Sequence, residues 1–530
     1  MSLDIIVVIL ALVGMLAVLV KDVMRPGMVL FSVVVLFLCF GIISPKEMLE
    51  GFSNKGMITV ALLFLVSEGV RQSGALTQVI KKILPQGKTT VAKAQLRMLP
   101  SIAFISAFLN NTPVVVIFAP IIKRWAKSVN LPASKFLIPL SYVTILGGLC
   151  TLIGTSTNLV VHGMMIDAGY DGIGMFELTL IGVPVTVAGI IYLLATSKRL
   201  LPDSDRIAAS DLQEDDVEPG DARHLMEVVI GPRFPGINKQ LKDFDFKRHY
   251  GAEVKEIKRN GKTIYRNLEK QRLYEGDTLV ILADDSFVPT WGESSVFLMI
   301  ANGKDPELKA NKRKRTFVLV LVVLMIIGAT VGELPVTREM FPNIKLDMFF
   351  FAAATTVIMA WTNVFPSKKY TKYISWDILI TIACAFGISK AMTNSGMADM
   401  IAKFIIDVSE SDFIASLGPN YGTYILLAIL YLVTNVITEL ITNNAAAALA
   451  FPLALSIATQ LGVDPTPFFM VICISASAGF TTPIGYQTNL IVQGIGNYKF
   501  TDFVRVGLPL NLLVFVISIL LIPQIWPFSL

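Results

Sequence analysis

The chain has 530 residues, of which 16% are charged and 54% are hydrophobic, and its formal net charge is +5. A soluble protein carries roughly 25% charged residues, and the mean hydropathy here is +0.64, so the composition indicates a polytopic membrane protein that sits in a lipid bilayer. Basic residues flank the apolar segments, and the positive charge therefore implies neither an acidic partner nor a nucleic acid.

Long apolar segments predict membrane-spanning helices, at roughly 20 residues per span with their flanks. They lie at residues 5–20, 28–43, 57–70, 316–331, 348–364 and 378–388. The first segment has neither a basic leader nor a small-residue cleavage site after it, so we expect a retained helix and not a signal peptide. The cysteines lie within apolar runs without paired spacing, which predicts no disulfide framework and no metal site. They are Cys39, Cys150, Cys384 and Cys473.

A polar interval divides the chain into three predicted parts. These are a first membrane repeat (1–199), an insert with its linkers (200–312) and a second membrane repeat (313–530). Lys198-Arg199 precedes the insert and Lys312-Arg313-Lys314-Arg315 follows it, so the positive-inside tendency places the insert in the cytoplasm of a cell membrane. The acidic stretch from Asp203 to Asp221 is predicted to be a flexible linker.

The insert has the pattern of a small α/β module. Strands are predicted at 224–230, 252–258 and 278–283, a helix at 238–248, and a hairpin turn at Asn260-Gly261. No Gly-x-Gly-x-x-Gly motif opens a nucleotide-binding unit anywhere in the chain.

The core of the insert, residues 225–288, resembles the RCK-C domain of the TrkA-C type. The matching residues are Phe246, Tyr250, Gly251, Val254, Ile257, Arg259 and Gly261, followed by Glu275-Gly276-Asp277-Thr278-Leu279. The resemblance implies a regulatory module that binds a small molecule, or a dimer contact. A passive cytoplasmic cap is an equal alternative.

The two membrane halves contain the same polar motifs. The stretch Thr151–Leu159 returns as Thr482–Leu490, with six of nine positions identical, and Asn110-Asn111-Thr112 corresponds to Thr442-Asn443-Asn444. In the first copy Asn158 follows Asn111 by 47 positions, and in the second Asn489 follows Asn443 by 46. We therefore expect one ancestral unit used twice, and an odd number of spans per unit would make the two copies inverted repeats.

Each copy predicts a re-entrant hairpin and a broken helix. Apolar arms flank the polar tips at 110–113 and 442–444, and the second motifs lie within the long apolar runs 136–165 and 468–495. Glycines in the second motifs allow the backbone to unwind, and the Thr-Asn pairs that follow can cap the half-helix that resumes. These residues are Gly154, Thr157 and Asn158 in the first copy, and Gly485, Thr488 and Asn489 in the second.

The tips and breaks carry almost no charge. No Lys, Arg, Asp or Glu occurs in residues 101–122, 136–166, 440–463 or 465–498. An anion there must be held by helix N-termini and by Ser, Thr and Asn donors, while oxygen ligands suit Na⁺, which would supply the missing positive charge. Glu439 either neutralises a cation or accepts hydrogen bonds from the hairpin backbone. His162 is expected to be a hydrogen-bonding contact and not a proton carrier.

At these motifs the chain resembles the divalent anion:sodium symporter family. The family implies an all-α polytopic membrane fold with inverted repeats and re-entrant hairpins, a homodimer, and an elevator-type transport domain. It implies sodium sites at Asn111, Gly154 and Asn158 and at Asn443, Gly485 and Asn489. It also implies substrate contacts at Asn110, Thr112, Thr157, Thr442, Asn444 and Thr488.

The variable motif positions favour sulfate as the substrate. Dicarboxylate members of the family show Ser-Asn-Thr tips and Thr-Pro-Pro-Asn breaks, whereas this chain has Thr-Ser-Thr-Asn and Tyr-Gln-Thr-Asn at the breaks. We therefore predict a sodium-coupled symporter of sulfate or a similar oxyanion, not an enzyme, with a sodium-coupled dicarboxylate symporter as the alternative. Two alternatives come from other classes of protein, an RCK-regulated cation channel and a transport-derived anion sensor. No potassium-channel filter sequence occurs in the chain, which argues against the channel.

Overall fold

The computed structural model describes residues 2–21, 24–203, 223–231, 234–291, 296–301, 312–409 and 421–528, and these are mostly helical. The first half contains α1 (Leu3–Val20), α2 (Pro26–Cys39), α3 (Pro45–Glu50), α4 (Lys55–Gln72), α5 (Ala75–Ile83), α6 (Val91–Ser106), α7 (Asn111–Ser128), α8 (Leu137–Gly148), α9 (Ser156–Asp167) and α10 (Thr179–Leu200). The second half contains α13 (Lys312–Gly332), α14 (Pro335–Met340), α15 (Met348–Trp361), α16 (Trp376–Asn394), α17 (Met397–Ser409), α19 (Tyr421–Leu440), α20 (Asn443–Leu461), α21 (Thr466–Ser477), α22 (Gln487–Gly496) and α23 (Phe500–Ile525).

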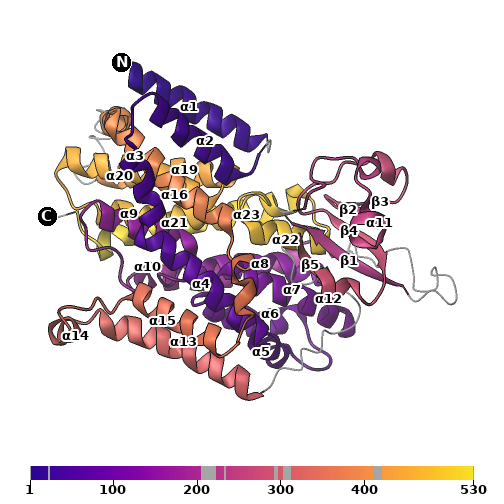
Figure 1. Cartoon of the computed structure of the whole chain (residues 1–530). Helices are drawn as coiled ribbons and strands as arrows, with labels where there is room; N and C mark the ends of the chain where they lie inside the picture. Colours follow the sequence, from indigo (N-terminus) through magenta and orange to yellow (C-terminus); the bar gives the residue numbers. More distant parts are fainter. Residues whose placement is uncertain are drawn as a thin grey trace.

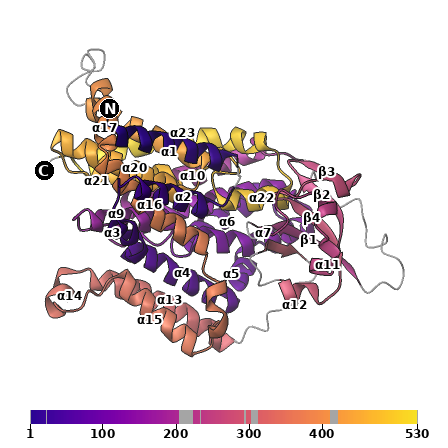
Figure 2. The ribbon, with the colours of Figure 1, turned by 45° about the horizontal axis from the view of Figure 1, so that its top comes forward.

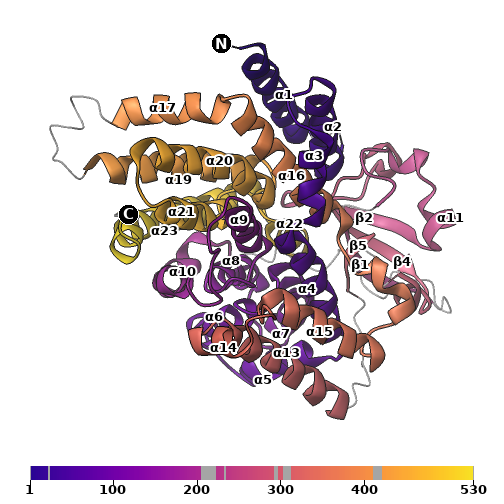
Figure 3. The same ribbon diagram turned by 60° about the vertical axis from the view of Figure 1, so that its left-hand side comes forward.

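The helices confirm a multi-span membrane protein. Within the described residues, eight helical stretches are long and apolar enough to cross a membrane. Each of the six apolar segments expected from hydropathy overlaps one helix, in α1, α2, α4, α13, α15 and α16. In Figures 1 and 3, α1 and α2 lie on one side of the molecule and α13 and α15 on the other, and Figure 3 shows α8, α9 and α22 near the middle between them.

The interruptions expected within the apolar runs are also present. The chain leaves the helix between α8 and α9 and between α21 and α22, and short tips join α6 to α7 and α19 to α20. Since each arm of α8, α9, α21 and α22 has 12 residues or fewer, none is long enough to cross a bilayer alone. The broken-helix prediction is confirmed.

One glycine in each half lets a long helix approach a break. A Cβ on Gly182 of α10 would lie 2.5 Å from the carbonyl oxygen of Leu149, and a Cβ on Gly507 of α23 would lie 2.0 Å from that of Phe480. Leu149 and Phe480 lie in the two breaks, each two residues before the motif threonine, and only glycine permits these contacts. The repeated Gly-x-Pro motifs thus pack α10 and α23 against equivalent points.

The insert is built on a five-stranded sheet with the order β3-β2-β4-β1-β5. All the pairings between neighbouring strands are antiparallel. The strands are β1 (His224–Ile230), β2 (Glu253–Arg259), β3 (Lys262–Ile264), β4 (Thr278–Ala283) and β5 (Phe297–Ala301). In Figures 1 and 2 this sheet stands at one end of the helical part, beside α22 and α7.

Most of the predicted elements of the insert are confirmed. β1 and β4 have the expected bounds, and β2 is shifted by one residue. Asn260 and Gly261 both adopt positive φ, 50° and 77°, as a two-residue hairpin turn between β2 and β3 requires. β5 was not predicted from the sequence.

The predicted helix at 238–248 is wrong. A 3₁₀ turn occupies Leu241–Asp243, and α11 spans only Phe246–Tyr250. Residues before it pair with another segment instead, because Ile237 and Gln240 form β-bridges with Leu273 and Arg272. The Asp245 side chain then accepts from the Arg248 backbone N–H and starts α11 there. The acidic linker expected from Asp203 to Asp221 lies, apart from Asp203, outside the described residues.

Candidate functional site

The first hairpin tip is fastened to the first broken helix by two hydroxyl groups. Ser106 Oγ, at the end of α6, donates to Asn111 Oδ1 at 2.7 Å and to the Thr144 carbonyl at 2.9 Å. The Thr151 hydroxyl donates to the carbonyl of Ala107. The side chain that opens α7 is therefore oriented by both α6 and α8.

The second tip has the same arrangement at equivalent positions. Thr438 Oγ1 donates to Asn443 Oδ1 at 3.0 Å and to the Ala476 carbonyl at 2.5 Å. Thr482 Oγ1 donates to the Glu439 carbonyl at 3.1 Å. The duplication seen in the motifs thus extends to the hydrogen bonds that hold them.

The asparagines of the second motifs hold the unwound backbone of the breaks. Asn158 Nδ2 donates to the carbonyls of Gly148 (3.4 Å) and Thr151 (3.0 Å). Asn489 Nδ2 donates to the carbonyls of Gly479 (2.8 Å) and Thr482 (3.0 Å). Each amide therefore joins both sides of its break.

The expectation that these asparagines and the threonines before them cap the resuming helices is wrong. The N-cap residues of α9 and α22 are Thr155 and Tyr486, and neither cap side chain accepts a hydrogen bond from its helix. Asn158 and Asn489 lie inside the first turn and reach backwards instead. The physical reason is that the broken segment leaves carbonyls unpaired in the protein interior, and the amides satisfy them.

The two motif glycines serve close approach and not a special backbone angle. Gly154 and Gly485 are absent from the glycines with positive φ. A Cβ on Gly154 would lie 2.5 Å from the Gly148 carbonyl oxygen, and a Cβ on Gly485 would lie 2.6 Å from Glu439 Oε2. The prediction that these glycines let the backbone unwind is therefore wrong. They are needed because a side chain would not fit at either position.

The tip of each half meets the break of the other half. Thr112 Oγ1 donates to Gln487 Oε1 at 3.2 Å, which joins the starts of α7 and α22. Ser156 Oγ donates to Asn444 Oδ1 at 3.1 Å, which joins the starts of α9 and α20, and Thr157 Oγ1 lies 3.5 Å from the same oxygen. These contacts are equivalent under exchange of the two halves.

Tyr486 connects two of these helix starts. Its hydroxyl accepts a 2.7 Å hydrogen bond from Asn111 Nδ2 and lies 3.2 Å from Thr155 Oγ1. α8 supports the second break from behind, since Ser141 Oγ donates to Thr488 Oγ1 (2.8 Å) and to Asn489 Oδ1 (2.7 Å). These contacts bring six of the predicted residues into one cluster across the two halves, namely Asn111, Thr112, Thr157, Asn444, Thr488 and Asn489.

Four helices begin at this cluster without side-chain caps. The N-cap residues of α7, α9, α20 and α22 make no capping hydrogen bond through their side chains. They are Asn110, Thr155, Thr442 and Tyr486. Uncapped backbone N–H groups and the positive ends of the helix dipoles favour a bound anion.

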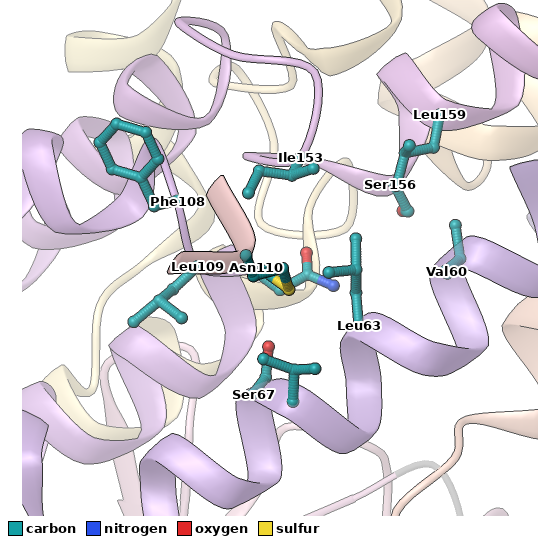
Figure 4. Close-up of a pocket in the computed structure, with 11 residues that line it drawn as sticks. Val60, Leu63, Ser67, Phe108, Leu109, Asn110, Ile153, Ser156 and Leu159 are labelled. Atoms are coloured by element: carbon teal, nitrogen blue, oxygen red, sulfur yellow. The ribbon is translucent and has the colours of Figure 1, made fainter. Parts of the chain in front are cut away.

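A small cavity opens beside the first tip. It is lined by Asn110 and Ser156 of the motifs and by residues of α4, among them Ser67. In Figure 4 the Asn110 amide lies between the α4 side chains of Leu63 and Ser67 and the segment that carries Ile153 and Ser156. About 10 Å³ can hold the centre of a water molecule, which is room for about one water.

Oxygen atoms converge near the first tip. An added Cβ on Gly148 would lie 2.9 Å from Asn111 Oδ1 and 3.1 Å from the Gly154 carbonyl oxygen. The buried Asn158 Oδ1 has no hydrogen-bond partner, whereas its equivalent Asn489 Oδ1 accepts from Ser141. Amide and carbonyl oxygens are ligands for hard cations. Within the described residues, no group of three or more His, Cys, Asp or Glu side chains gathers as a transition-metal site would need.

Glu439 supports the second break. Its Oε1 accepts from the Thr481 backbone N–H at 2.7 Å and its Oε2 from that of Thr482 at 2.9 Å. Asn511 Nδ2 also donates to Oε1 at 3.0 Å. The carboxylate thus accepts from backbone N–H groups of the break and not from its own hairpin. His162 Nδ1 accepts from the Ile173 N–H at 2.9 Å, which agrees with a hydrogen-bonding role.

Several supporting residues of the site were not predicted from the sequence. Ser106 and Thr438 each precede the central tip asparagine by five positions, and this repeated spacing is a signal that could have found them. Ser141 and Asn511 have no such repeat signal.

Comparisons with known proteins identify the family of the chain. The chain matches the citrate transporter family (CitMHS) over residues 8–459 and 344–528. An uncharacterized transporter of Synechocystis sp. is 29% identical over 93% of this chain and 92% of its own length. Sodium/sulfate cotransporter 1 of Chlamydomonas reinhardtii is 21% identical over 90% and 84% of the two chains. A sodium-dependent dicarboxylate transporter of Staphylococcus saprophyticus is 20% identical over 91% and 78%. The chain therefore belongs to the citrate transporter family, within the superfamily of divalent anion:sodium symporters, and is a membrane transporter and not an enzyme.

Proposed function

We propose that this transporter couples the uptake of sulfate, or of a similar divalent oxyanion, to sodium. The observation that carries the proposal is the meeting of four helix N-termini without side-chain caps, two from each half, at one cluster. A tetrahedral anion needs hydrogen-bond donors from several directions, and helix N-termini supply them without a cationic side chain.

The anion lies between the two tips in this proposal. Asn110 and Thr112 contact it from the first tip, and Thr442 and Asn444 from the second. Thr157 and Thr488 stand behind them in the first turns of α9 and α22. The cross-contacts Thr112–Gln487 and Asn444–Ser156 support the proposal, because they hold each tip beside the break of the other half.

Sodium ions lie behind the anion, one in each half. The first site uses Asn111, Gly154 and Asn158, and the second uses Asn443, Gly485 and Asn489. The unpartnered Asn158 Oδ1 supports the first site, because a buried oxygen without a hydrogen bond is costly unless something binds it. Glu439 Oε2, close to Gly485, adds negative charge at the second.

The coupling follows from the charges. No charged side chain other than Glu439 lies on the tips and breaks, so a divalent anion alone would meet only partial positive charges. Bound sodium makes the site electropositive and thereby raises anion affinity. Each ligand must raise the affinity of the other by the same factor, since linkage is reciprocal.

We further propose an elevator-type homodimer in the cell membrane, built from inverted repeats at 1–199 and 313–530. The insert, at residues 200–312 with an RCK-C-like core at 225–288, faces the cytoplasm. Basic residues on both sides of the insert support this orientation.

A sodium-coupled carboxylate transporter is the second candidate. The name of the matched family and the dicarboxylate transporter among the relatives favour it. The small volume beside Asn110 favours the compact oxyanion, because a citrate molecule would have to displace more of the packing.

Uptake into proteoliposomes separates the candidates. Purified protein would be reconstituted and supplied with labelled sulfate, succinate or citrate, with an inward sodium gradient or with potassium in its place. We expect sodium-dependent sulfate uptake. Sodium-dependent uptake of succinate or citrate without sulfate would favour the second candidate, and uptake of none would contradict both.

A further inference from the structure

The insert lies against two of the four helices that begin at the candidate site. β5 lies against α7 and β1 against α22. The same views that place the sheet at one end of the molecule show it beside these two helices (Figures 1 and 2). The N-terminal ends of α7 and α22 are joined by the hydrogen bond from Thr112 to Gln487. The insert therefore contacts the far parts of helices whose starts form the site.

On the α7 side, a partly buried cluster of charges makes the contact. Glu227 of β1 binds Lys123 of α7 at 2.6 Å and Lys258 of β2 at 2.9 Å. Burial raises the pKa of Glu227, but Lys123 and Lys258 outweigh it and hold that pKa at about 2. The Lys258 side chain is 4% exposed, and those of Glu227 and Lys123 are 22% and 21% exposed. Such a cluster demands exact placement of all three partners, because a misplaced buried charge is costly.

On the α22 side, the hairpin turn of the insert holds the end of the helix. Asn260 Oδ1 accepts from Gln493 Nε2 at 2.9 Å, and the Gly261 N–H donates to Asn497 Oδ1 at 2.9 Å. A Cβ on Gly494 would lie 2.6 Å from the Gly276 carbonyl oxygen, so the insert and α22 are in backbone contact. The contact thus depends on particular side chains, Asn260, Gln493 and Asn497, as well as on close backbone packing.

We propose that the insert is a clasp that fixes α7 to α22, and that Glu227 is a positioning residue for the substrate site between their starts. Both helices begin at the site. Besides packing on each other, both are held by the insert away from the site, so the insert adds a second constraint on their relative position. When Glu227 is bound to Lys123 and the turn is bound to α22, Thr112 and Gln487 stay within hydrogen-bond distance. Release of the insert lets the two starts separate and lowers anion affinity. The effect on affinity rests on the proposed function, whereas the clasp itself does not.

The test uses full-length protein in lipid nanodiscs. Glu227→Gln keeps the side-chain shape and removes the charge, and Gln493→Ala removes the α22 contact. Lys262→Gln changes an exposed charge in β3 of the same sheet and is the matched control. Hydrogen–deuterium exchange of the α7 and α22 peptides is the first measurement, and the KM and maximal rate of sodium-driven anion uptake are the second.

We expect the backbone amides of α7 and α22 to exchange about tenfold faster in E227Q and Q493A than in the wild type, because each variant loses one coupled contact. The control K262Q should exchange at the wild-type rate. The KM for the anion should rise about fivefold with a maximal rate within about twofold of wild type. Unchanged exchange in folded E227Q and Q493A protein would overturn the clasp. Faster exchange with no anion uptake by the wild type would instead contradict the proposed function and leave the clasp supported.

Discussion

The Asn111 amide of the first half donates a 2.7 Å hydrogen bond to the Tyr486 hydroxyl of the second half. The same hydroxyl lies 3.2 Å from Thr155 Oγ1. One phenol thus links the start of α7 to the start of α9 although it comes from the opposite repeat. Its repeat equivalent is Thr155, so the two N-cap residues of the broken helices touch each other.

Tyr486→Phe should weaken sodium binding. The change leaves the Asn111 amide without its acceptor in a buried place, which costs about 1–3 kcal/mol. We expect a rise in the half-saturating sodium concentration of about fivefold or more, measured as anion uptake against sodium concentration. Tyr370→Phe, at an exposed tyrosine, is the control and should leave the curve unchanged. A wild-type sodium curve for Tyr486→Phe would show that Asn111 needs no such partner.

Asn111→Ala and Asn443→Ala should each reduce sodium activation more than surface expression. Each change removes an oxygen from one proposed sodium site, while the hydroxyl that bonded it, of Ser106 or Thr438, keeps its backbone carbonyl acceptor. Uptake should therefore need about tenfold more sodium in either variant. If both variants keep the sodium dependence of the wild type, the tips are structural only.

Gly154→Ala should destabilise the protein. The new methyl group would meet the Gly148 backbone, which cannot move without disturbing the break, and overpacking of this kind costs about 1–3 kcal/mol. Gly14→Ala is the matched control, since a Cβ there meets no atom within 4 Å. Thermal unfolding in nanodiscs should show a lower midpoint for Gly154→Ala only. Equal midpoints would mean that the break adapts to a side chain at this point.

Acid should remove the contribution of Glu227 to stability. Its pKa in the folded protein is about 2 against an ordinary 4.5, because Lys123 and Lys258 outweigh the effect of burial. A lowered pKa stabilises the folded state above the ordinary value, and the stabilisation is lost as the pH falls from about 4.5 through about 2. The difference in unfolding midpoint between the wild type and E227Q should be constant from about pH 8 to about pH 5 and shrink below about pH 4.5. A difference that grows in acid would contradict this origin.

Much of the fold could be predicted because its causes are local. Apolar length predicts the spans, and alternating residues with an Asn-Gly turn predict β1, β4 and the β2–β3 hairpin. The helix at 238–248 was predicted wrongly because Ile237 and Gln240 pair with residues more than 30 positions away, and helical spacing carries no information on such partners. β5 is a five-residue apolar run, and the strand it pairs with in the described part of the chain is β1, far away in sequence.

The candidate site was predictable in its members but not in its contacts. Duplication drew attention to Asn111, Asn158 and their equivalents, because chance does not repeat a motif at the same spacing. What these side chains do depends on where carbonyl groups are left unpaired, and that becomes visible only when the breaks fold. Local sequence predicts that Asn158 caps its helix. In the structure its amide instead satisfies the Gly148 and Thr151 carbonyls, which the break leaves unpaired.

The two halves differ most at one pair of equivalent positions. The Thr151 and Thr482 hydroxyls donate to the carbonyls of Ala107 and Glu439, so Glu439 stands where the first half has only a methyl group. The duplicated network is therefore symmetric in its hydrogen bonds and asymmetric in its charge. On the proposed assignment, the ion site beside Glu439 has the higher affinity and fills first as sodium rises. On the same assignment, the uncharged site of the first half fills last.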